Sequence, residues 1–61
     1  MTVETEIGSI TATPEVLNEI AIAFGDSEVI NQLRRNTALA DKAREISFTI
    51  YYALREIGFY D

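Results

Sequence analysis

The fold is decided by residues 39–58, which read LADKAREISFTIYYALREIG. Apolar residues recur there at alternating spacings of four and three. At about 100° per residue, this spacing places them on one narrow stripe of an α-helix. The stripe comprises Leu39, Ala43, Ile46, Ile50, Ala53 and Ile57. The segment is therefore predicted to be the longest helix and the centre of the core.

A second group of large side chains lies on nearly the opposite side of this helix. Phe48, Tyr51 and Tyr52 form the group, and Arg44 and Arg55 lie at its margins. Since a helix with apolar side chains on two faces needs two partners, so short a chain covers only one face comfortably. Aromatic residues beside arginine are typical of protein–protein interfaces. We predict that these five residues form an interaction surface; core packing is the alternative.

The chain of 61 residues is predicted to form one small domain, residues 1–61. Such a domain buries only about 60% of the surface that its unfolded chain exposes, and small domains usually gain stability from disulfides, metals or oligomerisation. The absence of cysteine and histidine excludes disulfides and the commonest zinc ligands. Because 48% of the residues are hydrophobic, we predict a homo-oligomer, a dimer or larger. A well-packed monomer is the alternative.

The charge of the chain limits the class of partner. The net charge is −5, from ten acidic and five basic residues. Nucleic acid is not favoured, because phosphates are normally neutralised by a basic patch. No apolar run approaches the length of about 20 residues that a membrane span needs, and no signal peptide is visible. We expect a cytoplasmic protein without direct membrane insertion, whose partner is itself or another protein.

Residues 1–13 are predicted to form a short arm of β-structure. Residues 3–7 alternate in the manner of a strand, with apolar residues and threonine on one face and Glu4 and Glu6 on the other. Gly8 and Ser9 interrupt the pattern. They form either a two-residue turn that pairs residues 3–7 with residues 10–13, or a bulge in one longer strand. We favour the single strand, because residues 10–12 make a weak second one.

Three helices are predicted to follow, at residues 14–24, 27–36 and 38–57. Thr13 caps the first helix, Pro14 opens it and Gly25 ends it. A break near Asn36 separates the second helix from the third; one continuous helix over residues 27–57 is the alternative. The predicted fold class is mainly α, with a short N-terminal β-strand or hairpin followed by three helices, the last one longest. The predicted core is Ile7, Ile10, Val16, Leu17, Ile20, Phe24, Val29, Ile30, Leu33, Leu39, Ala43, Ile46, Ile50, Ala53, Leu54 and Ile57.

The sequence offers little for catalysis. No histidine is present to activate a serine. Asp26 and Glu28 lie at a predicted helix start, where carboxylates usually cap the helix and complement its dipole. Glu4 and Glu6 share a strand face but lack the oxygen-rich loop that a hard cation needs. We predict no catalytic, cofactor-binding or metal-ligating residues, and a protein that is not an enzyme.

Two segments resemble the alkaline-shock/general-stress protein family. The family's opening strand and helix are similar to Thr5-Glu6-Ile7-Gly8-x-Ile10 followed by Pro14-Glu15-Val16 and Ile20-Ala21. Residues 39–58 look like its last helix. The resemblance covers about half of the chain. It implies a cytoplasmic, non-enzymatic, self-associating protein that acts near the cell envelope through a partner, with no catalytic residues to carry over.

The order of strand, helix, Gly25-Asp26-Ser27 and helix also resembles ribbon-helix-helix repressors and antitoxins. In these proteins two chains pair their N-terminal strands and lay the ribbon in the major groove. Here the strand would present Glu4 and Glu6 to phosphates. Our main prediction is therefore a small acidic interaction protein that self-associates through the aromatic face of its last helix. A ribbon-helix-helix-like DNA-binding regulator or antitoxin is the alternative.

Overall fold

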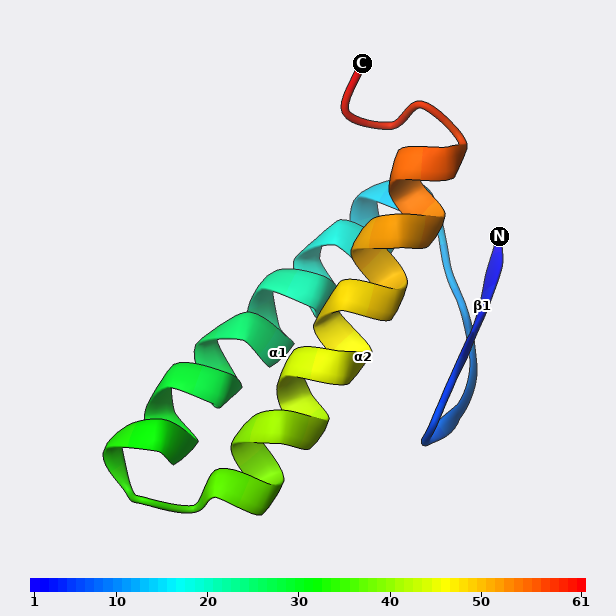
Figure 1. Ribbon diagram of the computed structural model, residues 1–61. Helices are drawn as coiled ribbons and strands as arrows, with labels where there is room; N and C mark the ends of the chain where they lie inside the picture. The colour runs from blue at the N-terminus through cyan, green and yellow to red at the C-terminus, as the bar shows by residue number, and fades with distance from the viewer.

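The computed structural model describes residues 1–61 and shows a β-hairpin followed by two long antiparallel helices (Figure 1). The strands are β1 (Thr2–Thr5) and β2 (Gly8–Thr11), and the helices are α1 (Pro14–Leu33) and α2 (Thr37–Glu56). The two helices lie side by side, and the hairpin packs against one face of the pair. The fold is mainly helical, as predicted, but the prediction of three helices with the last one longest is wrong, since the structure has two helices of 20 residues each.

The predicted helices over residues 14–24 and 27–36 are one helix, because Gly25 does not end α1. Gly25 lacks the positive φ of a left-handed helix cap. A Cβ placed on it would lie 3.8 Å from Ser47 Oγ of α2, an ordinary van der Waals distance. Glycine inside a helix costs only about 1 kcal/mol relative to alanine, and packing along the whole of α2 outweighs that cost. The predicted start is correct, since the Thr13 hydroxyl accepts a hydrogen bond from the Val16 amide at 3.3 Å.

Residues 34–36 join the two helices in a tight turn. Arg35 has a left-handed backbone, with φ of 59°. The amide of Asn36 donates to the Asn31 carbonyl at 2.8 Å, which closes the end of α1 in the manner of a Schellman motif. The Asn36 side-chain oxygen then accepts from the Leu39 amide at 3.3 Å and caps α2. The predicted break near Asn36 is present, and one helix over residues 27–57 is not.

The N-terminal arm is a hairpin, and the single strand that we favoured is wrong. Thr5 pairs with Gly8, so the turn consists of Glu6 and Ile7, two positions earlier than predicted. Gly8 has the positive φ that the turn requires, 119°, whereas neither turn residue has one. The Thr5 hydroxyl supports the turn by donating to the Gly8 carbonyl at 2.8 Å. As a result, Ile7 lies at an exposed tip rather than in the core.

The core lies where the hairpin meets the seam between the helices. It is one cluster of Val3, Leu17, Ala21, Ile46, Ile50 and Leu54. Val3 reaches it because β1 turns the Val3–Ile10 pair toward the helices. Residues predicted in the core and found buried are Leu17, Ala43, Ile46, Ile50 and Leu54, and those found partly buried against the cluster are Ile10, Ile20, Phe24 and Ala53.

The other core predictions are wrong. The exposed residues among them are Ile7, Val16, Val29, Ile30, Leu33, Leu39 and Ile57. In one continuous helix, Val29, Ile30 and Leu33 turn away from α2, whereas a separate helix could have turned them inward. Leu39 and Ile57 lie at the two ends of α2, where little of the chain remains to cover them. The buried residues that the prediction missed are Val3, Ala21, Ala40 and Ser47.

Candidate interaction surface

Phe48 and Tyr52 lie on the outer side of α2, one turn apart. Phe48 is 49% exposed and Tyr52 is 61% exposed. Their ring centroids are 6.2 Å apart, and the rings are tilted by 41°. We call this pair the aromatic ridge. Solvent-exposed aromatic side chains of this kind often anchor protein–protein interfaces.

Tyr51, predicted to belong to the same surface, has a different environment. It is half-buried, packs against the core and lies 6.1 Å from Tyr60 between ring centroids. The Tyr60 hydroxyl donates to Asn18 Oδ1 at 2.5 Å, which ties the C-terminal residues to the start of α1. Desolvation, with a further contribution from Tyr51, raises the pKa of Tyr60 above its usual 10.0. The two tyrosines hold the end of the chain against the helix pair.

The two predicted arginines differ in their contacts. Arg44 Nε lies 4.0 Å from Glu28 Oε2, and Arg44 Nη2 lies 3.4 Å from Asp41 Oδ1. Exposed ion pairs of this kind contribute only about 0–1 kcal/mol. Arg55 forms no salt bridge and borders a shallow hollow with Tyr52 and Glu56. Both guanidinium groups are accessible to a binding partner.

The outward side of α1 is a second apolar surface, which the sequence analysis missed. Its exposed members are Val16, Ile22, Val29, Ile30 and Leu33, and Leu33 is 80% exposed. Glu15, Glu19 and Asp26 lie among these residues, so α1 is apolar on two sides but not around its whole circumference. Here α2 and the hairpin cover only one side of α1. Reading residues 14–33 as one helix would have revealed this surface.

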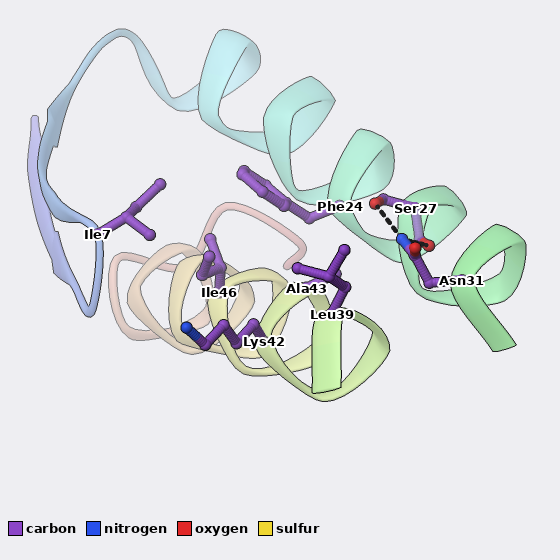
Figure 2. A pocket seen from close by; sticks show the side chains of 8 residues that line it. All are labelled: Ile7, Phe24, Ser27, Asn31, Leu39, Lys42, Ala43 and Ile46. Atoms are coloured by element: carbon purple, nitrogen blue, oxygen red, sulfur yellow. Dashed lines mark hydrogen bonds between the residues drawn. The ribbon is translucent and has the colours of Figure 1, made fainter. Parts of the chain in front are cut away.

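The helix pair has two faces. The hairpin covers one, where Ile7 lies beside Phe24 and Ile46 (Figure 2). We call the opposite side the open face, which carries Tyr60 at one end, beside Asn18. Helical periodicity of about 100° per residue assigns to the open face Ile22, Val29 and Leu33 of α1, together with Arg44, Tyr51 and, at its edge, Phe48 of α2.

A groove continues along the hairpin face beyond the hairpin tip. It has a volume of about 240 Å³ and is lined by Ile7, Phe24, Ser27, Asn31, Leu39, Lys42, Ala43 and Ile46 (Figure 2). The Asn31 amide already donates to the Ser27 carbonyl at 2.8 Å, and Lys42 is the one charged residue of the lining. Small-molecule sites usually measure about 300–1,000 Å³ and offer several convergent polar groups. The groove has neither property.

The remaining chemistry of the chain is sparse. No three His, Cys, Asp or Glu side chains gather in a way that would hold a metal ion. Every buried polar side-chain atom has a hydrogen-bond partner, including the Ser47 hydroxyl. Neither helix combines the length and apolar character that crossing a membrane requires.

Comparison with known proteins gives no relative. No family model, no curated protein and no solved structure matches the chain. The two resemblances drawn from short sequence segments therefore stay predictions.

Proposed function

We propose that this protein is a small, non-enzymatic interaction protein of the cytoplasm, and that it self-associates. The observation that carries the proposal is the number of large apolar side chains that are exposed to solvent. Twelve large hydrophobic or aromatic residues are exposed, whereas eight hydrophobic residues are buried. Monomeric proteins rarely expose contiguous apolar patches larger than a few hundred Å². Covering the exposed apolar residues of the open face, which include Ile22, Leu33 and Phe48, would therefore stabilise the fold.

The size of the chain suits such an interface. A standard interface buries about 800 Å² on each partner, and the chain exposes 4242 Å². About a fifth of the surface would thus be covered. Burial of apolar surface contributes roughly 25 cal/mol per Å² before the costs of association are subtracted. The residue types also fit, because Phe, Tyr and Arg are enriched at interface centres.

The DNA-binding alternative gains nothing from the geometry. In a ribbon-helix-helix protein the strands pair between two chains, whereas β1 here pairs with β2 of the same chain. The hairpin exposes the Glu4 carboxylate, which accepts a hydrogen bond from the Ser9 hydroxyl at 2.7 Å. An acidic hairpin repels phosphates. We do not propose this function.

The test is the absolute mass of the protein in solution, measured by light scattering after size exclusion from micromolar to millimolar concentration. We expect a dimer or larger species that dissociates on dilution. A monomeric mass over the whole range would overturn the proposal. Added duplex DNA at low salt should leave the elution position unchanged.

Two substitutions connect the mass to the surface. Phe48→Asp should weaken association while the helical circular dichroism stays, because Phe48 lies outside the core. Ile50→Asp should unfold the chain, because it places an unpaired charge at a fully buried site. Ile7→Asp is the matched control, an equally drastic change at the exposed hairpin tip. If Ile7→Asp alone lowered the mass, the groove beside the hairpin would be the interface instead.

A further inference from the structure

Acidic and basic residues are separated along the chain. Residues 1–33 contain six acidic residues and no basic one, whereas residues 34–61 contain five basic and four acidic ones. Every charge on α1 is therefore negative, and Arg44 and Arg55 both lie on α2. The two helices differ in charge as well as in sequence.

These charges border the open face on opposite sides. Glu15, Glu19 and Asp26 lie about 120–160° around α1 from Ala21, the residue that faces α2. Arg44 and Arg55 lie about 120–140° around α2 from Ile50, in the same rotational sense. Because the helices are antiparallel, equal rotations in one sense lead to the same face. The open face thus has an acidic edge along α1, whereas α2 presents Arg44 and Arg55 on it beside Phe48, with Asp41 further around the helix, about 180° from Ile50.

The contacts between the helices fix which residues are level with each other. The Ser47 hydroxyl meets the Ala21 carbonyl at 2.8 Å, and Arg44 meets Glu28 at 4.0 Å. Because the helices are antiparallel, a step of one residue forward along α1 corresponds to a step of one residue back along α2. Two residues are level when they lie at the same height along the helix pair. The level pairs on the open face are Glu15 with Arg55, Ile22 with Phe48, and Asp26 with Arg44.

We propose that the open face binds a second copy of the same face, with the two-fold axis parallel to the helices. This pairing rests on the proposed self-association and specifies its geometry. A rotation about that axis keeps every residue at its level and places α1 of each copy on α2 of the other. Ile22 then meets Phe48 of the other copy, and Asp26 meets its Arg44. The result is an antiparallel four-helix bundle with the hairpins on its two outer sides.

Charge complementarity selects this arrangement over the other two-fold arrangement. If the axis ran across the helices, α1 would lie on α1, and the acidic edges of the two copies would face each other. Like charges in contact oppose association. With the axis parallel to the helices, the acidic edge of each copy faces the α2 of the other copy, which carries Arg44 and Arg55. Two 20-residue helices are about 30 Å long, and side by side about 20 Å wide, which matches an interface of about 800 Å² per partner.

The absence of cysteine makes cross-linking a direct test. Two full-length variants, Ile22→Cys and Phe48→Cys, are mixed in equal amounts and oxidised, and the disulfide-linked dimers are identified by mass. Both positions are exposed in the single chain, so neither substitution disturbs the core; circular dichroism checks this. Lys42→Cys is the control, because Lys42 lines the groove on the hairpin face.

The relative yields of the disulfide-linked dimers distinguish the possible arrangements of the two copies. We expect the mixed dimer, position 22 joined to position 48, to exceed both self-linked dimers at least tenfold, and no product from Lys42→Cys with either variant. Self-linked dimers at position 22 would mean that α1 lies on α1, which overturns this pairing and leaves self-association standing. Equal yields from all mixtures, Lys42→Cys included, would mean random collision and overturn the pairing. No product, together with a monomeric mass, would overturn self-association as well.

Charge reversal gives a second measurement that needs no cysteine. Asp26→Lys should raise the dimer dissociation constant about tenfold, since each dimer contains the contact with Arg44 twice. Arg44→Asp should do the same, although it also removes the contact with Glu28 in its own chain. The decisive variant carries both changes, and its dissociation constant should return toward that of the unchanged protein. A double variant weaker than either single variant would overturn the pairing of Asp26 with Arg44.

Discussion

The buried hydroxyl of Ser47 donates a 2.8 Å hydrogen bond to the backbone carbonyl of Ala21 and so joins the two helices directly. This bond lies beside Gly25, where an added Cβ would be 3.8 Å from Ser47 Oγ, an ordinary van der Waals distance. Ser47 and Ala21 therefore align the two helices and lie buried in the seam between them.

Ser47→Ala should destabilise the fold by about 1 kcal/mol, because a buried hydrogen bond is lost without a large change in volume. For a domain of this size, that corresponds to a fall in Tm of about 4–8 °C. Thr49→Ala is the matched control, since the Thr49 hydroxyl bonds only the Glu45 carbonyl within α2. Thermal unfolding of both variants gives the comparison. An equal loss in the two would mean that the bond to Ala21 contributes nothing specific.

Gly25→Ala should stabilise the protein by about 0.5–1 kcal/mol, because alanine is favoured over glycine inside a helix. The added methyl group would meet Ser47 Oγ at an ordinary distance of 3.8 Å. Urea unfolding measures the change. If Gly25 instead had the left-handed backbone of a helix end, alanine would destabilise the protein, and α1 would be two helices.

Arg35→Gly should stabilise the turn by about 0.5–1 kcal/mol. Arg35 has a φ of 59°, a conformation that costs a residue with a Cβ about 1–2 kcal/mol, and the greater freedom of glycine in the unfolded chain takes back part of the gain. Arg34→Gly provides the contrast, because Arg34 has an ordinary φ of −83°. We expect Arg34→Gly to destabilise the protein in the same urea titration. Stabilisation by both, or by neither, would contradict the turn geometry described above.

The stability of the protein should fall at high pH because of Tyr60. Its pKa in the folded chain is raised above the ordinary 10.0, so the native state keeps its proton where the unfolded chain has begun to lose it. The contribution of protonated Tyr60 to the free energy of unfolding is therefore present below pH about 10 and is lost as the pH rises through that value. Tyr60→Phe should show a smaller decline between pH 9 and pH 11 (roughly one unit on either side of the ordinary value), measured by thermal unfolding. An identical decline in both proteins would contradict the assignment to Tyr60.

The sequence predicted α2 well because its periodicity is long and regular, and because Asn36 is a good cap before it. It failed at Gly25, where Gly-Asp-Ser has the local signature of a helix stop and restart. Tertiary packing overrides that signature: as one helix, α1 packs along the whole of α2, and the Ser47 hydroxyl bonds the Ala21 carbonyl one turn before Gly25. The hairpin turn was misplaced for a related reason, since Gly8 supplies its positive φ just after the turn rather than inside it.

Which exposed residues of the candidate surface could be predicted depended in the same way on the helix boundaries. The period of α2 placed Phe48 and Tyr52 on the outer side, where they are exposed. A break was predicted at Gly25, and a separate helix after it could turn Val29 and Leu33 inward. The exposed apolar side of α1 was therefore not predicted. Tyr51 could not be separated from its neighbours by periodicity, because its contact with Tyr60 depends on how the C-terminal residues fold back.

The placement of β1 against α2 sets the order in which the chain assembles. The hairpin and the helix pair each form from segments adjacent in the sequence, and the docking of β1 on α2 joins the two ends of the chain. Contacts between near neighbours form quickly, whereas distant ones carry a larger entropy of loop closure. We expect the helix pair to close first and the hairpin to dock last. The amide protons of β1 and β2 should then exchange with solvent through a local opening of the hairpin, at lower free energy than those around Leu17 and Ile50.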